Sequence, residues 1–370
     1  MNRNLICVLM ALASVFVATT ASAGNNCTWA LSRGVKVLVA DCTTDTSILL
    51  ASGKWDLGGH TIMAIDPVGD HFRGGILTAT GSNVSITNGR IQADGLADIC
   101  DTGNDRLRGV FFPGYGGSVS YMDVLGINQG PSSCQEGNGV EFSNIGGTEV
   151  SATLNRVHVD GYQKNGITFN GNISVSVRGC STVGGDYGYL NYIAQNGMQF
   201  GYGAHGLARS NSINGRWYDG DLIWSATGIL VFESDGVTIS GNDVINNKVG
   251  VALEAWGFLA PSADENVVSG NRVTNSMWGI TAQAYTLGLG YSNMDSSCSY
   301  NKIRSNTISN KSFEGDTGIF LGASYDWGGE ETGFTPIMTG NQVTDNNISG
   351  FSVGIVDDGA GNHIKSNPFK

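Results

Sequence analysis

The sequence predicts an all-β protein in which short strands stack as a solenoid. Three observations carry this prediction. Glycine is abundant, with 55 residues, whereas proline accounts for 6 residues and charged side chains for 14% of the chain, a composition that suits many tight turns. Short segments of β type recur with no helical periodicity. Two residue markers also repeat in register along much of the chain.

The chain is expected to begin with a cleavable signal peptide, residues 1–23. Met1–Arg3 is a short basic start, Leu5–Val17 is apolar, and Ala21-Ser22-Ala23 has the small residues of a cleavage site. No second long apolar run follows. We therefore expect a secreted or periplasmic protein with no membrane partner, in which residues 24–370 form a single domain.

The charge balance bears on the partners. The formal net charge is −12, and it becomes −13 if Arg3 leaves with the signal peptide. Nucleic-acid binding requires clustered Lys and Arg, and no such cluster is visible, so no nucleic acid is expected as a partner. An acidic protein also repels polyanions at long range, which favours a neutral glycan or a calcium-assisted site. The protein is expected to be a monomer.

Six cysteines follow the predicted signal peptide, and an even number in an exported chain indicates disulfides. The most local pairings are Cys27 with Cys42 and Cys100 with Cys134, although the sequence leaves other connectivities open. The remaining two are Cys180 and Cys298. No CxxC spacing occurs, so a zinc site is not expected.

The repeat has two interleaved markers. One is an Asn that follows a short strand, and the other is a Gly followed by an apolar residue. Each unit carries three short β segments, such as VTIS, DVIN and GVALE, and stacked units about 4.8 Å apart would share one core. The Asn residues are expected to occupy left-handed turns and to bond along the axis as a ladder. The markers are Asn211, Asn242, Asn271, Asn306, Asn341 and Asn367, and Gly139, Gly166, Gly197, Gly228, Gly250, Gly279, Gly318 and Gly354.

These registers resemble the repeats of the pectate-lyase-like superfamily, and the segments WDLGGHTIMA (Trp55–Ala64) and NVSITNGRIQ (Asn83–Gln92) resemble its first coils. The resemblance covers residues 40–367. It implies a right-handed parallel β-helix, here of about ten coils by the repeat register, with long loops flanking one sheet. The superfamily contains lyases, hydrolases, epimerases, phage tailspikes and copper-insertion proteins, so the fold does not select an activity.

The resemblance also implies a substrate groove over the sheet formed by the first strand of each coil, the strand that begins at the Gly marker. Loops lengthen around this sheet between about residues 199 and 327, where we expect the groove. Alternation along a strand places the second and fourth residues after the Gly outward. The residues expected to point inward are Ile229, Val231, Val251, Leu253, Ile280, Ala282, Ile319 and Leu321.

The lengthened loops are rich in aromatic residues, whose faces can stack on sugar rings. A single aromatic side chain more often packs its own loop than binds a ligand, so the cluster carries the prediction. The expected substrate-binding residues are Gln199, Tyr202, Arg216, Trp217, Tyr218, Trp224, Trp256, Gln283, Tyr285 and Trp327.

Two sets of residues are candidates for catalysis. Glu254, Glu233, Asp219 and Asp221 could supply the paired carboxyl groups of a glycoside hydrolase. His205 and Arg209, with Arg216 and Lys164, could instead serve an elimination, although a lone His is more often structural. No cofactor is required, but loop carboxylates could hold Ca²⁺. Five scattered His residues argue against copper delivery.

The sequence is best interpreted as a secreted carbohydrate-active protein that cleaves a polysaccharide, as a lyase or a glycoside hydrolase, in the groove over the first-strand sheet. The alternative is a non-catalytic surface or matrix protein that binds glycan in the same groove. The enzyme requires at least two ionisable groups near one sugar linkage, whereas the binding protein requires only the aromatic platform.

Overall fold

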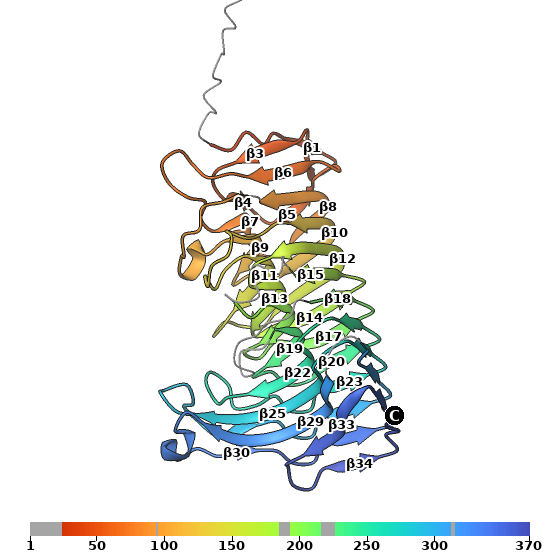
Figure 1. Ribbon diagram of the computed structural model, residues 1–370. Helices are drawn as coiled ribbons and strands as arrows, with labels where there is room; N and C mark the ends of the chain where they lie inside the picture. The colour runs from red at the N-terminus through yellow and green to blue at the C-terminus, as the bar shows by residue number, and fades with distance from the viewer. Residues whose placement is uncertain (1–23, 94, 185–192, 216–225, 312–314) are drawn as a thin grey trace, which may run out of the picture.

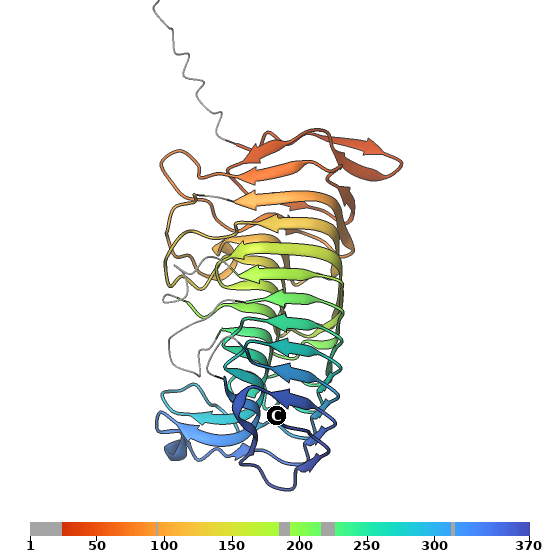
Figure 2. The same ribbon diagram turned by 45° about the vertical axis from the view of Figure 1, so that its right-hand side comes forward.

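The chain winds into a stack of coils that share two long sheets (Figures 1 and 2). The computed structural model describes residues 24–370 except 94, 185–192, 216–225 and 312–314. One sheet has 11 strands and takes a single strand from each coil, and we call it the first-strand sheet. The predicted parallel β-helix is therefore confirmed, with eleven coils in this sheet where about ten were expected.

All pairings of the first-strand sheet are parallel. Its strands are β4 (Ile48–Leu50), β7 (Gly75–Ala79), β9 (Arg108–Pro113), β11 (Asn138–Asn144), β13 (Asn165–Gly171), β16 (Asn196–Gly201), β19 (Thr227–Phe232), β22 (Val249–Ala255), β25 (Trp278–Leu287), β29 (Gly315–Asp326) and β33 (Phe351–Asp357).

The 21-stranded outer sheet contains the second and third strands of the coils, because three long strands bend through both rows and join them. These long strands are β8 (Val84–Ala93), β10 (Gly117–Leu125) and β12 (Val150–Tyr162). Each bends at a residue with positive φ, namely Asn88, Tyr121 and Arg156. The other second strands are β2 (Val35–Leu38), β5 (Gly53–Asp56), β14 (Ile173–Arg178), β17 (His205–Arg209), β20 (Val237–Ser240), β23 (Val267–Ser269), β27 (Lys302–Arg304), β31 (Gln342–Thr344) and β34 (His363–Lys365).

The remaining elements complete the coils and their ends. The third strands are β3 (Cys42–Thr44), β6 (Thr61–Ala64), β15 (Ser181–Gly184), β18 (Ser212–Asn214), β21 (Asp243–Ile245), β24 (Arg272–Thr274), β28 (Thr307–Ser309) and β32 (Asn347–Ser349). β1 (Trp29–Ser32) pairs with β2 in antiparallel fashion, and β26 (Ser296–Ser297) pairs with β30 (Pro336–Ile337). Two short 3₁₀ helices are η1 (Gly103–Asp105) and η4 (Gly329–Thr332).

One continuous hydrophobic core fills the stack, and the eight side chains expected to point inward all belong to it. Aromatic residues form a file inside the first-strand sheet. The ring centroids of Phe112 and Phe142 lie 4.0 Å apart, those of Phe142 and Phe169 5.8 Å, and those of Phe169 and Phe200 5.3 Å. Equivalent positions of successive coils thus stack directly, as the repeat requires.

The Gly marker is explained by a close approach between coils. A Cβ atom on Gly166 would lie 2.5 Å from the carbonyl oxygen of Gly197, the equivalent residue of the next coil. No side chain fits at that distance, so the corner that leads into each first strand requires glycine.

The expected Asn ladder is confirmed, but with a different member. Each Oδ1 accepts the backbone N–H of the ladder residue in the preceding coil, as between Asn242 and Asn271 at 2.9 Å. Asn306 bonds to Asn346 and not to Asn341, because the intervening loop is longer. Asn341 instead lies in a second ladder, at the turn before the second strand, and bonds to Asn301. The ladder residues are Asn211, Asn242, Asn271, Asn306, Asn346 and Asn367 in the first, and Asn266, Asn301, Asn341 and Asn362 in the second.

The ladder Asn residues do not themselves occupy the left-handed turns, and this part of the prediction was wrong. The left-handed backbone belongs to the residue before each ladder Asn, such as Gly241 with φ 61° and Ser305 with φ 55°. The Asn itself is required for its amide, which turns into the stack and bonds to backbone groups of neighbouring coils.

Both expected disulfides form, Cys27–Cys42 and Cys100–Cys134. Cys180 and Cys298 are free thiols buried in the stack. Disulfides of this kind are typical of proteins exported from the cytosol. Among the described residues, no helix is long and apolar enough to span a membrane.

Candidate functional site

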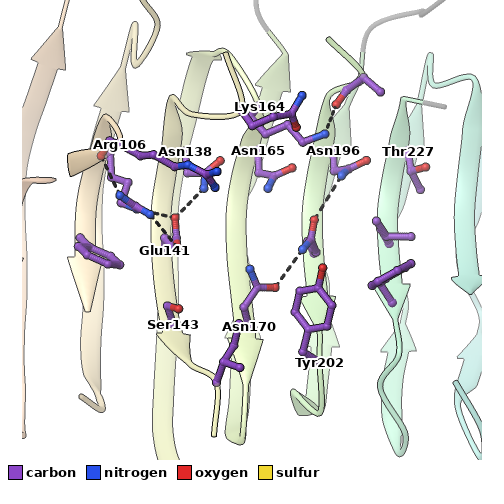
Figure 3. Close-up of a pocket in the computed structure, with 18 of the residues that line it drawn as sticks. Arg106, Asn138, Glu141, Ser143, Lys164, Asn165, Asn170, Asn196, Tyr202 and Thr227 are labelled. Atoms are coloured by element: carbon purple, nitrogen blue, oxygen red, sulfur yellow. Dashed lines mark hydrogen bonds and ion pairs between the residues drawn. The ribbon is translucent and has the colours of Figure 1, made fainter. Parts of the chain in front are cut away.

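A cavity of about 450 Å³ lies on the outer face of the first-strand sheet, over the strands from β9 to β22 (Figure 3). Six strands about 4.8 Å apart give it a length of roughly 24 Å along the stack. It begins farther toward the N-terminal end than the expected groove and overlaps it only from Gln199 to Trp256. The lining residues are Gly103, Asn104, Arg106, Arg108, Phe111, Gln135, Asn138, Glu141, Ser143, Ile145, Lys164, Asn165, Asn170, Ala194, Asn196, Gln199, Tyr202, Thr227, Leu230, Phe232, Glu254 and Trp256.

The floor of the cavity contains a row of amides that the sequence analysis missed. Asn138, Asn165 and Asn196 occupy the same position of neighbouring strands, just before the Gly marker, and Thr227 continues the row. The sequence analysis assigned outward positions only to residues that follow the Gly, so it did not include this row. The signal was the recurring dipeptide Asn-Gly at the start of three first strands.

The N-terminal end of the floor is fixed by a buried ion pair. The Nε atom of Arg108 donates to Oε2 of Glu141 at 2.7 Å, and Nδ2 of Asn138 donates to the same oxygen at 2.6 Å. The Arg108 guanidinium also lies 4.1 Å from the ring centroid of Phe111. Arg108 and Glu141 neutralise each other, so neither is free to do chemistry in the cavity.

The middle of the floor is a chain of neutral hydrogen bonds. Asn196 donates from Nδ2 to Oε1 of Gln199 at 3.3 Å, and Gln199 donates from Nε2 to Oδ1 of Asn170 at 2.9 Å. Figure 3 shows the Tyr202 ring beside Asn170, on the side opposite the amide row. Burial raises the pKa of Tyr202 to about 12, so this phenol is a neutral donor at every ordinary pH. Gln199 and Tyr202 both line the cavity, and their expected role in substrate binding stays a prediction.

Glu254 is the expected catalytic residue that the cavity contains. It lies near the end of β22, between Phe232 of β19 and Gln283 of β25. Its carboxyl group has no hydrogen bond or ion pair among the described residues, and burial alone raises its pKa to about 8. The group is therefore largely protonated at neutral pH.

Two basic side chains, Arg106 and Lys164, also line the cavity, and Figure 3 shows both near the amide row. Lys164 donates from Nζ to the carbonyl oxygen of Ala194 at 2.7 Å, and burial lowers its pKa to about 8. Arg106 makes no side-chain hydrogen bond or ion pair within the described part of the chain, and its buried Nε has no acceptor. Lys164 was a candidate for elimination chemistry by sequence, whereas Arg106 was not expected in the site.

The aromatic residues of the loops mainly pack on each other. Trp256 is 7% exposed and contacts Phe232 edge to face, with ring centroids 5.0 Å apart. It belongs to a second hydrophobic cluster that also includes Leu287 and is bordered by Tyr202, Tyr285 and Trp327. Trp256 also lines the cavity, whereas Tyr285 and Trp327 do not.

Glu233 does not line the cavity, because its carboxylate supports a loop. The side chain is 1% exposed and accepts the backbone N–H groups of Leu259 at 2.8 Å and Ala260 at 3.0 Å, as well as that of Phe258. Burial raises its pKa, and the N–H donors oppose that rise. Both carboxylate oxygens are thus occupied in holding the loop that follows β22.

His205 and Arg209 lie in β17 of the outer sheet, and neither lines the cavity. Nε2 of His205 is 3.3 Å from Oε2 of Glu149, with both side chains partly exposed. Gln283 also lies outside the cavity and donates to the hydroxyl of Tyr285. The structure therefore does not bring His205 or Arg209 together with Glu254.

Six expected site residues lie outside the described residues, because they fall in the segment 216–225: Arg216, Trp217, Tyr218, Asp219, Asp221 and Trp224. Their roles stay predictions.

The described residues contain one group of three potential metal ligands within reach of each other, namely Cys100, Cys134 and Glu136. Both thiols are consumed in the disulfide, and Glu136 accepts the N–H groups of Asp101 and Leu107. This group does not form a metal centre. Calcium binding stays a prediction.

A scan against protein-family profiles and a search of curated proteins returned no match. The chain is similar to several solved structures. One is a mutant tailspike of the E. coli bacteriophage HK620, solved with a pentasaccharide, with a TM-score of 0.58 at 11% identity. The match covers 90% of this chain and 58% of the tailspike chain. An exopolygalacturonase from Thermotoga maritima gives 0.53 at 13%, covering 86% and 80%.

A mutant of the periplasmic alginate epimerase AlgG gives a TM-score of 0.52 at 15% identity, covering 92% of this chain and 79% of its own. At such identities these likenesses show the fold alone. This chain is therefore a right-handed parallel β-helix with the pectin-lyase-like fold.

Proposed function

We propose that this protein is a carbohydrate-active enzyme that binds a polysaccharide in the cavity and cleaves it with Glu254 as the proton donor. The observation that carries the proposal is the carboxyl group of Glu254, partly buried in a cavity of amides and hydroxyls with no partner of its own and a pKa raised to about 8. Solved structures with the same fold are named for polysaccharide chemistry, and one was solved with a pentasaccharide, which supports the choice of substrate class.

The chemistry follows from the protonation state. A neutral carboxylic acid can protonate the glycosidic oxygen as the bond to carbon breaks, which removes the cost of expelling an alkoxide. Hydrolysis and elimination both need this proton, so the role of Glu254 does not depend on which of them occurs. The partner group differs, since hydrolysis requires a second carboxylate and elimination requires a base.

The described residues offer limited choices for that second group. Glu141 is neutralised by Arg108, and Glu233 is occupied by backbone donors. We propose Asp219 or Asp221 as the second carboxylate for hydrolysis, since they belong to the loop that leads into β19, a strand of the cavity floor.

The proposal also has a thermodynamic rationale. Burying a carboxyl group without a hydrogen bond costs about 1–3 kcal/mol, so such a group is expected where function requires it. A non-catalytic glycan-binding protein with the same cavity is the second candidate, favoured by the neutral amide row and by Trp256 in the cavity lining. This alternative gives Glu254 no task.

The test is a polysaccharide panel that includes pectate, alginate and neutral glucans. Reducing ends and absorbance near 235 nm are both recorded, because the latter reports elimination. Glu254→Gln should lower turnover at least about 100-fold, the usual range for a general acid, while binding changes less than threefold. Glu149→Gln, which alters an exposed carboxylate beside His205, should change neither. Full activity of the Glu254 variant would contradict the proton-donor role, and binding with no cleavage by the wild type would favour the binding protein.

A further inference from the structure

The cavity differs in charge from the rest of the molecule. The whole chain has a formal net charge of −12, yet no Asp is found among the described residues that line the cavity. The charged lining, counted over the same residues, consists of three basic residues and two Glu. Arg108 and Glu141 cancel as an ion pair, and Glu254 is largely neutral at pH 7. Arg106 and Lys164 remain as cations with no carboxylate bonded to them among the described residues.

These two side chains lie along one edge of the cavity, where the first strands begin. Lys164 immediately precedes Asn165 of β13, and Arg106 precedes β9 two strands away. In Figure 3 the Arg106 side chain extends toward Asn138, and Lys164 lies above Asn165. The Lys164 ammonium bonds a neutral carbonyl, which leaves its charge uncompensated. Arg106 interacts electrostatically with Glu136, but the two side chains are not bonded, and Glu136 is 1% exposed and accepts two backbone N–H groups.

The neighbouring amides add acceptors for sugar hydroxyl groups. Asn138 and Asn165 are 9% and 4% exposed, and the Oδ1 atom of each is buried without a donor, while Nδ2 of Asn138 already donates to Glu141. A guanidinium and an ammonium are the donors with which proteins recognise carboxylates and sulfates. Such cations raise the local concentration of an anionic ligand even in a protein of the same overall sign.

We propose that Arg106 and Lys164 form a subsite for the negatively charged substituent of an acidic sugar, and that the Oδ1 atoms of Asn138 and Asn165 accept hydrogen bonds from hydroxyl groups of the same sugar. This inference rests on the proposed function and specifies the substrate as an anionic glycan. It replaces the expectation of a neutral glycan, which the net charge of the chain had favoured.

The subsite is remote from the proposed acid. Asn165 is in register with Val249, which lies three strands along and five residues before Glu254. At about 4.8 Å per strand and 3.3 Å per residue, the two places are roughly 20 Å apart. The subsite therefore contacts a sugar several units from the scissile bond, and its loss should affect binding more than turnover.

The test uses oligosaccharides of pectate, of alginate and of a sulfated glucan. Each is compared with its neutral counterpart, made by reducing the carboxyl groups or removing the sulfates. Binding is measured by calorimetry at two salt concentrations. Arg106→Gln and Lys164→Gln are each expected to weaken binding of the anionic form about tenfold, and the double variant about 100-fold, with less than a twofold change for the neutral form. The salt dependence of binding should fall as well.

Controls separate charge from folding. The double variant Lys302→Gln/Arg304→Gln removes the same charge from an exposed strand of the outer sheet and should bind like the wild type. Arg106→Lys should retain most of the affinity, and the melting temperature of every variant is recorded. Where a polymer is cleaved, KM should rise while kcat changes little.

Each outcome is informative. If the wild type binds anionic and neutral forms equally, or if the Arg106/Lys164 double variant binds the anionic form normally, the subsite is excluded and the proposed function stands. If no oligosaccharide of either kind binds the wild type, the proposed function fails and this inference fails with it. A preference for sulfated over carboxylated ligands would identify the anion.

Discussion

At the scale of single residues, Glu254 sets the expected pH dependence. Its folded-state pKa is raised from 4.5 to about 8, and the proposed role uses the protonated form. Turnover should therefore be retained from about pH 5 to pH 7 and should fall as the pH rises through 8. Initial rates in a series of buffers at fixed ionic strength measure this profile. A decline that begins near pH 5 would contradict the role.

The same shift predicts a stability effect. Between pH 4.5 and 8 the folded state keeps a proton on Glu254 that the unfolded state releases, so this residue makes unfolding easier as the pH rises. Glu254→Gln removes that dependence. The melting temperature of the variant should exceed that of the wild type by a few degrees at pH 8.5 and should match it near pH 4.5. Equal differences at both pH values would show that the carboxyl does not titrate as described.

Residue-scale features differed in how well the sequence predicted them. The inward side chains of the first strands were predicted correctly, because alternation along a strand is fixed by backbone geometry. The position of Glu233 was not, since it follows the strand end, where alternation no longer determines direction. Arg106 was missed because its role depends on which carboxylates are near it, and a sequence does not give that.

At the scale of elements, the Asn ladder is a testable source of stability. Asn346 and Asn347 are adjacent in sequence, but Asn346 is buried in the ladder and Asn347 is exposed on β32. Asn346→Ala leaves the backbone N–H of Asn306 without its acceptor and removes the bond to the carbonyl of Ile303. Unfolding in urea should show a loss of about 2–4 kcal/mol.

Asn347→Ala is the matched control and should cost less than about 0.5 kcal/mol, as for most exposed substitutions. Equal effects of the two variants would mean that the ladder contributes nothing beyond packing. The repeat markers predicted such a ladder, but its last members depended on loop lengths. The 40-residue interval from Asn306 to Asn346 exceeds the mean spacing, so Asn341 was assigned to the wrong register.

At the scale of the whole molecule, the two disulfides should differ in their functional effect. Cys100–Cys134 connects the loops that contribute Gly103, Asn104, Arg106 and Gln135 to the cavity, whereas Cys27–Cys42 lies in the first coil. Their sequence separations of 34 and 15 residues correspond to about 4 and about 3 kcal/mol of stability.

Replacing both cysteines of either pair by Ser should therefore lower stability by similar amounts. Loss of Cys100–Cys134 should also weaken glycan binding, because the loop that carries Arg106 is released, whereas loss of Cys27–Cys42 should leave binding intact. Binding measured at a temperature where both variants are folded decides this. Equal binding by the two variants would remove the disulfide from the account of the cavity.

The fold as a whole was predictable because the same Asn and Gly markers recur about every 30 residues, once in each coil. The location of the site was not, since loop length indicated the C-terminal coils while the cavity lies over β9 to β22. Loops that looked like walls of a groove pack instead into a second hydrophobic cluster around Trp256. Such packing is a property of tertiary contacts that loop composition does not specify.

The most direct test is a crystal structure of Glu254→Gln soaked with the oligosaccharide that the panel selects. We predict density for a chain of sugars along the first-strand sheet from β11 to β22, with one glycosidic oxygen next to residue 254 and an acidic substituent between Arg106 and Lys164. Sugar density on the outer sheet, or on the loops beyond β25, would contradict the central claim that this cavity is the site.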